Sequence, residues 1–288
     1  MGLGSGDLVL CSGTLPRDVS FADRLAAAAG AGFGAVSLWG RDYGRARRDG
    51  LSDADIRSML ADHGLAVAEI DPAWWWLPGA AEVGASIPPA HDEQNVFAYG
   101  EDELLRIAET VGARSLNAVD VFGGEWDVEQ GAEALAALAD RAAEHGLLVH
   151  LEFLPWSRVP DVATAWEIVR LADRPNAGVA VDSWHFAHSG SDDATLQKVP
   201  GDRVLGIQLS DGPSRIVGDP VAATLHAREL PGTGELGVVS LVRTLDQIGA
   251  AAPIGVEVFS DELHGLGPAE AARRAAVATR AVLDAARP

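Results

Sequence analysis

The sequence is short of cysteine, of basic residues and of long apolar runs, and each shortage excludes a class of protein. One cysteine among 288 residues, Cys11, rules out an internal disulfide framework and indicates a reducing compartment. No apolar run approaches the roughly 20 residues of a membrane-spanning helix. The first ten residues also lack the basic region and apolar stretch of a secretory signal. We therefore expect a cytoplasmic protein with no membrane partner.

Basic residues are outnumbered by acidic ones. Lys and Arg total 22 against 42 Asp and Glu, which gives a net charge of −20. Such a charge repels phosphate backbones at long range, so nucleic acid is not an expected partner. Glycine-rich phosphate loops are missing too, because neither G-x-G-x-x-G nor G-x-x-x-x-G-K follows the first apolar run. These absences disfavour nucleases, dinucleotide enzymes and nucleoside triphosphatases, and leave a small molecule as the expected partner.

What the sequence does contain is an alternation of apolar runs and helical patterns, repeated roughly every 30 residues. The apolar runs predict strands at residues 8–13, 34–40, 65–71, 114–120, 147–153, 176–182, 204–211 and 253–260. The stretches between them predict helices at residues 20–30, 52–63, 101–111, 127–145, 161–173, 192–198, 237–249 and 267–286.

Strands that are apolar throughout and alternate with helices indicate a parallel sheet covered by helices. Eight such units fit a closed (β/α)₈ barrel better than an open sheet. We therefore predict an α/β protein with one barrel domain over residues 1–288. The longest connections, 71–100 and 210–236, follow the third and seventh strands, where a barrel carries functional loops.

Polar residues alternate with apolar ones in the last four predicted strands. In the fifth strand Leu151 and Phe153 flank Glu152. Because neighbouring strand side chains point to opposite faces, the apolar pair faces the helices and Glu152 faces the barrel interior. The same alternation turns Asp182, Gln208 and Glu257 inward. Since all four residues lie near the carboxyl ends of their strands, we expect them to converge at the mouth of the barrel.

Three carboxylates that face one another in a buried place require a positive partner, because each unpaired buried charge is costly. With the amide oxygen of Gln208 they make an all-oxygen set of ligands, which suits Mg²⁺ or Mn²⁺ better than Zn²⁺ or Co²⁺. Taken singly, each carboxylate could equally cap a helix or form one half of an ion pair. Taken together, Glu152, Asp182, Gln208 and Glu257 favour a site for one divalent metal ion.

Two cationic or titratable residues follow these strands. His185 comes three residues after Asp182, and this spacing allows it to contact a substrate oxygen near the metal; the alternative is that it covers apolar surface. Arg228, in "HARELPGTGE", is either a second group for substrate oxygens or a surface charge. His150, His188 and His226 are weaker candidates and are expected in loops or the core.

Tryptophans gather just past the predicted strand ends. Trp39, Trp156 and Trp184 do so singly, and residues 74–76 do so as a run of three that includes Trp75. An aromatic wall would bind the C–H face of a sugar or cyclitol ring, so Trp39, Trp75 and Trp184 are predicted substrate contacts. The alternative for the run of three is that it packs the long third loop as a lid.

The segments "LEFLP", "VDSWH", "IQLSDG", "RELPGTGEL" and "VEVFS" resemble the xylose isomerase-like barrel superfamily, often described as sugar phosphate isomerases and epimerases. This resemblance covers most of the chain. It implies that Glu152, Asp182, Gln208 and Glu257 hold one divalent ion, that His185 and Arg228 bind substrate oxygens, and that Glu152 and Glu257 act as an acid/base pair. Members of the superfamily often pair, which implies a homo-oligomer.

Gln208 departs from the commonest pattern of this superfamily. Ketose epimerases and inosose dehydratases usually have His at that position, whereas metal-dependent 3-dehydroshikimate dehydratases resemble this chain in having Gln. Endonuclease IV-type repair enzymes have a richer His, Asp and Glu set for three zinc ions and a basic groove, and this sequence shows neither.

These observations favour a metal-dependent isomerase or epimerase acting on a sugar or polyol ketone. A metal ion that is chelated by a carbonyl and an adjacent hydroxyl acidifies the neighbouring C–H, so that a carboxylate can remove the proton and form an enediolate. Expulsion of a β-hydroxyl instead gives a lyase, which is the first alternative, and a non-catalytic binding barrel is the second. Because few basic residues lie near the strand ends, a neutral or carboxylated polyol is favoured over a phosphorylated one.

Overall fold

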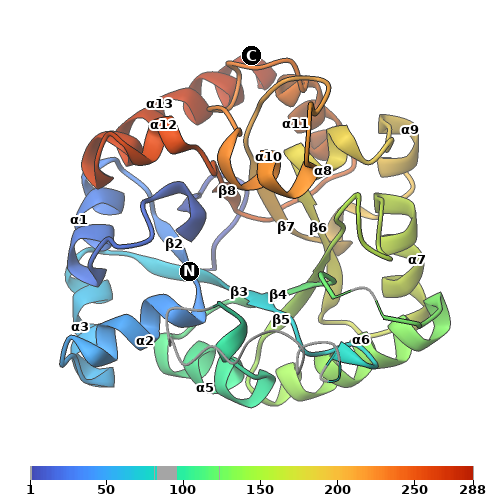
Figure 1. Cartoon of the computed structure of the whole chain (residues 1–288), viewed down its shortest axis with the longest axis horizontal. Coiled ribbons are helices and arrows are strands. Elements are labelled where there is room, and N and C mark those ends of the chain that lie inside the picture. The colour runs from blue at the N-terminus through green and yellow to red at the C-terminus, as the bar shows by residue number, and fades with distance from the viewer. Residues whose placement is uncertain (1, 81, 83–95, 123, 288) are drawn as a thin grey trace.

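The computed structural model describes residues 2–80, 82, 96–122 and 124–287. Eight parallel strands pair in sequence order from β1 to β8, and β8 pairs back onto β1, so the sheet closes into a barrel. Figure 1 shows the strands in the centre and the helices in a ring around them. The predicted (β/α)₈ barrel is therefore confirmed. The strands are β1 Leu8–Leu10, β2 Ala35–Leu38, β3 Ala66–Ala73, β4 Ser115–Val119, β5 Leu148–Glu152, β6 Ala177–Asp182, β7 Val204–Leu209 and β8 Ile254–Val256.

Helices at all eight predicted places cover the barrel. They are α1 Phe21–Gly30, α3 Asp53–Asp62, α5 Glu101–Val111, α6 Val128–Glu144, α7 Val162–Ala172, α9 Asp193–Leu196, α11 Val238–Gln247 and α13 Pro268–Ala286. Packing of α1 against α13 joins the first unit to the last. Several helices begin where the sequence places a capping residue. Ser20, for example, accepts a hydrogen bond from the backbone N–H of Asp23, and Ser52 does the same for Asp55.

Further short helices stand where the sequence predicts strand or loop. They are α2 Gly40–Arg48, α8 Ser183–His188, α10 Pro220–His226 and α12 Asp261–His264, with 3₁₀ turns η1 Ser12–Thr14, η2 Val96–Ala98 and η3 Gly201–Arg203. The first and last strands are shorter than the predicted ranges 8–13 and 253–260, because the chain leaves the strand ladder after Leu10 and Val256. The hydroxyl of Thr14, in η1, donates to the carbonyl of Val256 and accepts from the N–H of Val258, so a side chain replaces the strand ladder there.

The large apolar core lies between the strands and the helices, as the alternation of side chains requires. Outward-facing residues such as Leu151, Val181 and Ile207 belong to it. Inside the barrel, a second and much smaller apolar cluster is formed by Val9, Ala35 and Ala68. The rest of the interior toward the carboxyl ends of the strands is lined largely by buried polar side chains.

The two long predicted loops are placed in part. Residues 210–236 contain α10 and an isolated antiparallel bridge that pairs Asp211 with Glu229. Much of the connection 71–100, namely residues 81 and 83–95, lies outside the described residues. Among the helices that the structure describes, none combines the length and the apolar character required to cross a membrane.

Candidate functional site

Five buried carboxylates gather at the carboxyl ends of the strands. Glu69 and Asp71 come from β3, Glu152 from β5 and Asp182 from β6, and Glu257 directly follows β8; none is more than 6% exposed. The three carboxylates that alternation in the sequence predicts thus face the barrel interior, and two more join them.

Asn117 in β4 connects two of these carboxylates. Its side-chain amide donates to Glu152 Oε2 at 2.7 Å and to Asp71 Oδ1 at 2.9 Å. Asp71 accepts a second bond from the indole N–H of Trp39, at 3.1 Å. The polar cluster is therefore continuous from the end of β2 to the end of β5.

One guanidinium group lies among the carboxylates. Arg228 Nη1 donates to Asp182 Oδ2 at 2.6 Å and lies 3.5 Å from Glu257 Oε2. No second Lys or Arg within the described ranges forms an ion pair with any of the five carboxylates. Since Arg228 is itself 2% exposed, it is no surface charge, and negative charge exceeds positive charge in this cluster.

The pKa values show how the metal-free cluster carries its negative charge. Burial, together with the charges of Asp182 and Asp71, raises the pKa of Glu152 well above its usual range. Burial also raises the pKa of Glu257 although Arg228 opposes this, and burial with the charge of Glu69 raises the pKa of Asp71 to about 7. Burial opposes ionisation of Asp182 as well, but Arg228 and His185 hold its pKa below the usual value.

The donor atoms at the mouth fit a divalent metal ion. Ligand atoms of Glu152, Asp182 and His185 lie within 4.8 Å of one another. The side-chain oxygen of Gln208 is buried and has no hydrogen-bond partner, although burying a polar atom without one is costly. Carboxylate and amide oxygens with an imidazole nitrogen are common ligands of divalent ions. Geometry therefore adds His185 to the predicted ligands.

His185 is a neutral imidazole held next to Arg228. Burial lowers the pKa of its ring to about 3. Arg228 Nη2 lies 3.3 Å from His185 Nε2, and because a guanidinium can only donate, Nε2 must accept. The ring proton then resides on Nδ1, which is buried without a hydrogen-bond partner. The edge of His185 meets the Trp156 ring at 5.4 Å between centroids.

The tryptophans take different positions. Trp39 reaches the mouth through its bond to Asp71, whereas Trp75 donates to the carbonyl of Phe97 at 3.1 Å and stacks on Phe122. Trp184 is 0% exposed, and its indole N–H donates to the hydroxyl of Thr224 in α10. A ring so enclosed offers no face to a substrate. Trp39 is also buried, with Arg41 over its ring, so the half-buried Trp156 is the better candidate for an aromatic wall.

Sequence reasoning missed Glu69, Asp71, Asn117 and the partner role of His150. His150 Nε2 lies 3.1 Å from Glu69 Oε2 inside the barrel. Asn117 could have been found by the same alternation of side chains, because it stands between two apolar residues of its strand, as Glu152 does.

The two other candidate histidines end short helices and do not lie in the loops or core that the sequence predicts. His188 ends α8 and bonds to the carbonyls of Trp184 and Pro213, His226 ends α10 and is exposed beside Asp261, and Cys11 is buried. None of these three residues joins the potential ligand group.

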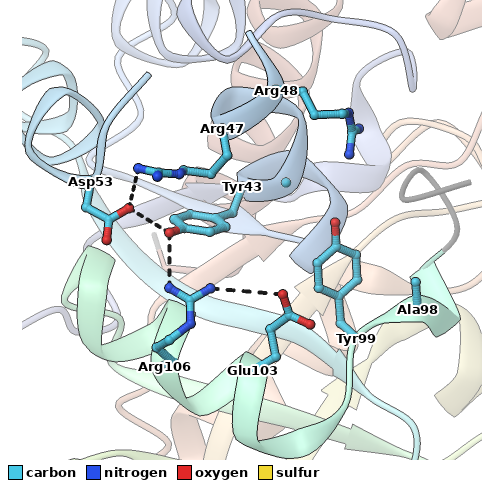
Figure 2. A pocket seen from close by; sticks show the side chains of 9 residues that line it. Tyr43, Arg47, Arg48, Asp53, Ala98, Tyr99, Glu103 and Arg106 are labelled. Atoms are coloured by element: carbon cyan, nitrogen blue, oxygen red, sulfur yellow. Dashed lines mark hydrogen bonds and ion pairs between the residues drawn. The ribbon is translucent and has the colours of Figure 1, made fainter. Parts of the chain in front are cut away.

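A separate cavity of about 510 Å³ lies between α2 and α5 (Figure 2). Its arginines are paired: Arg47 lies 2.7 Å from Asp53, and Arg106 bonds to the hydroxyl of Tyr43 at 3.2 Å. None of the five buried carboxylates lines this cavity. The carboxylate cluster at the barrel mouth is therefore the better candidate for a functional site.

Comparison with known proteins adds a family relationship. The sequence model of a family described as xylose isomerase-like TIM barrel matches residues 25–282. A 3-dehydroshikimate dehydratase from Pseudomonas aeruginosa is 29% identical over 255 residues, which are 88% of this chain and 37% of that protein. The chain thus spans little more than a third of the length of that relative.

Other similar proteins match the barrel over different extents. An inosose isomerase from Bacillus subtilis is 27% identical over 179 residues, or 60% of this chain and 63% of that protein. The crystal structure of the IOLI protein with a bound zinc atom superposes with a TM-score of 0.82 at 21% identity, and the match covers 96% of this chain and 98% of that one. At this identity the likeness concerns the fold.

Proposed function

Because the chain belongs to the xylose isomerase-like TIM barrel family, we propose that it is a divalent-metal-dependent enzyme that removes a proton next to the carbonyl of a small hydroxylated ketone. The observation that carries this proposal is a buried cluster in which Asp182 and Glu257 pair with a single guanidinium and ligand atoms of Glu152 and Asp182 lie within 4.8 Å of one another, beside an unpartnered oxygen of Gln208. Such a cluster contributes nothing obvious to stability, whereas it fits a metal and an acid/base pair.

Glu152, Asp182, Gln208 and Glu257 would hold the ion, with His185 near enough to join them. The mostly oxygen ligands favour Mn²⁺ or Mg²⁺, while the imidazole and the zinc-bound IOLI protein keep Zn²⁺ and Co²⁺ as alternatives. When bound, a divalent ion would polarise a substrate carbonyl and lower the pKa of the adjacent C–H.

Glu152 and Glu257 act as the acid and base. Both carboxyls are buried, and both have raised pKa values, which brings proton uptake and release closer to neutral pH than for an exposed Glu. They approach the mouth from opposite parts of the barrel, since one ends β5 and the other follows β8. A substrate between them can lose a proton to one carboxylate and receive one from the other.

Arg228 and His185 bind substrate oxygens in this proposal. Negative charge grows on the carbonyl oxygen as the proton leaves, and a fixed guanidinium stabilises it more than it stabilises the neutral ketone. His185 Nδ1–H is a buried donor without an acceptor, and a substrate hydroxyl or carbonyl would supply one.

Dehydration is the outcome that the similarity favours. The 3-dehydroshikimate dehydratase matches 88% of this chain, so we propose a lyase that expels a β-hydroxyl from a cyclic hydroxyketone. Isomerisation or epimerisation, which the sequence alone favours, is the second candidate. The Bacillus inosose isomerase supports it, as does the pair of glutamates, because return of the proton to another carbon or face needs no further group.

The test combines metal analysis with proton exchange. The purified protein, Glu152→Gln and Glu257→Gln are analysed for bound metal, then incubated in D₂O with 3-dehydroshikimate, an inosose and a ketose. We expect one divalent ion per chain, together with deuterium incorporated next to the carbonyl or a new product. The two variants should lose both the metal and the reaction. Water loss identifies the lyase, and an isomer or epimer identifies the second candidate.

Glu144→Gln is the matched control, since Glu144 is an exposed glutamate at the end of α6. It should keep the metal and the activity. A protein that binds no divalent ion and exchanges no substrate proton would contradict the proposal and favour a non-catalytic binding barrel.

A further inference from the structure

Arg41 is a half-buried guanidinium at the rim of the barrel. It lies in the first turn of α2, and its Cζ is 3.8 Å from the ring centroid of Trp39. Its Nε is buried without a hydrogen bond, and its guanidinium forms no hydrogen bond or ion pair with any residue that the structure describes. Burial lowers the pKa of Arg41 to about 10, so the group remains charged at neutral pH.

Other arginines of comparable or greater burial are paired. Arg24 lies 3.2 Å from Asp42, and Arg228 lies 2.6 Å from Asp182. On the same helix as Arg41, Arg47 pairs with Asp53 beside the cavity in Figure 2. The chain has a net charge of −20, yet none of the acidic residues that the structure describes forms an ion pair with Arg41, and the neighbouring Asp42 pairs with Arg24.

Trp39 connects Arg41 to the carboxylate cluster. One ring supports the guanidinium and, through its N–H, donates to Asp71 at 3.1 Å. The guanidinium and Asp71 are therefore neighbours of the same indole ring, which places Arg41 beside the mouth. The charge of Asp42 raises the pKa of Arg41, whereas Arg17, Arg24 and Arg45 lower it, and Asp42 is itself paired with Arg24.

We infer that Arg41 binds a carboxylate of the substrate while the ketone end of the same molecule lies among the residues of the barrel mouth. The inference rests on the proposed function and specifies its substrate class as a carboxylated cyclic hydroxyketone. A guanidinium presents two parallel N–H donors that match a carboxylate, and stacking on Trp39 holds this fork in place. One cation balances the single charge of a carboxylate, whereas a phosphate dianion would keep an unpaired charge beside the acidic mouth.

The experiment compares ligands that differ only in this charge. Binding of shikimate and of its neutral primary amide is measured by calorimetry to the metal-loaded wild type, Arg41→Gln and Arg41→Lys. Arg57→Gln, an exposed arginine of α3, is the control. We expect Arg41→Gln to weaken shikimate binding about 10- to 100-fold and to leave the amide unchanged. Arg41→Lys should recover part of the loss, and Arg57→Gln should resemble the wild type.

Equal effects of Arg41→Gln on shikimate and on the amide, or no effect on either, would overturn the inference. Inorganic phosphate that binds in an Arg41-dependent way, while shikimate does not bind, would overturn the carboxylate assignment. Failure of the proposed function is read separately, from metal content and solvent exchange in the wild type. If the wild type contains no metal and exchanges no proton but still binds shikimate through Arg41, the proposed function is contradicted and the role of Arg41 is not.

Discussion

The carboxylate of Glu69 accepts a hydrogen bond from the side-chain amide of Gln208, with 3.2 Å between Oε1 and Nε2. Because a carboxylate can only accept, the NH₂ end of the amide must face Glu69, and the oxygen must face away. That oxygen is the buried, unpartnered atom at the barrel mouth. Glu69, itself held by His150, thus fixes which end of Gln208 is presented to a metal ion.

The first prediction concerns this orientation. Glu69→Leu removes the acceptor, so the amide can turn its NH₂ toward the mouth, and we expect Mn²⁺ affinity to fall about 10- to 100-fold. The double variant Glu69→Gln with Gln208→Glu should restore part of the Mn²⁺ affinity, because the amide at position 69 can donate to the carboxylate at position 208. Calorimetric titration with Mn²⁺ measures both. Unchanged affinity in Glu69→Leu, at wild-type thermal stability, would show that Gln208 needs no such support.

The second prediction concerns Arg228. Its replacement by Met leaves Asp182 buried without its positive partner, so the metal-free protein should lose about 3–5 kcal/mol of unfolding free energy. Urea unfolding in the presence of a chelator measures this loss. Arg274→Met breaks an exposed ion pair with Glu270 and should cost less than about 1 kcal/mol. An equal loss of unfolding free energy in the two variants would show that the buried Arg228–Asp182 pair matters no more for stability than an exposed ion pair.

The third prediction is a pH dependence of the metal-free protein. The pKa of Asp71 is about 7 in the folded state, against about 3.9 in an unfolded chain. A raised pKa means that the folded state holds the proton more tightly. Its stabilising contribution is therefore full below about pH 4 and is lost as the pH rises through 7, by up to about 1.4 kcal/mol per pH unit for one proton. Glu152 and Glu257 act in the same direction.

Thermal unfolding of the chelated protein should therefore occur at a lower temperature at pH 8 than at pH 5.5. Asp71→Asn should show a smaller difference between the two pH values. The same pH dependence in the variant and in the wild type would exclude Asp71 as a contributor.

The fourth prediction is that metal and protons compete. Ions bind deprotonated carboxylates, so Mn²⁺ uptake at pH 6.5 should release protons, visible as a binding heat that depends on the ionisation enthalpy of the buffer. Free Mn²⁺ at 100 times its Kd should add about 2.7 kcal/mol to the unfolding free energy. At the same free Mn²⁺ concentration, the unfolding free energy of Glu257→Gln should increase by less than this. Equal stabilisation of both proteins would place the ion away from Glu257.

Alternation of side chains locates part of the site from sequence and fails where the strand is irregular. Glu152 and Gln208 each stand between two apolar residues, and the sequence predicts their burial correctly. In β3 the pairing with β2 shifts register, so that Val36 pairs with Val67 but Ser37 pairs with Glu69. A regular two-residue period does not describe such a strand, and register is a property of the neighbouring strand as much as of its own sequence.

Short helices explain the other differences. In the sequence, a helix cap and one half of an ion pair are separate alternatives for such a carboxylate, but Asp182 serves as both: its Oδ1 accepts from the N–H groups of Trp184 and His185, while Oδ2 bonds to Arg228. Because α8 begins immediately after β6, Trp184 turns under α10 instead of lining the mouth. Six residues of helix carry too weak a periodic signal to predict this turn.

The small size of the apolar cluster inside the barrel, Val9, Ala35 and Ala68, has a consequence for protein engineering. Most apolar burial lies between strands and helices, away from the polar residues at the mouth. Exchanging those polar residues therefore removes little of the buried apolar area on which the scaffold depends. Libraries that vary the carboxyl ends of the strands but keep the Arg228–Asp182 pair should retain a high fraction of folded members, which makes this chain a suitable starting point for directed evolution.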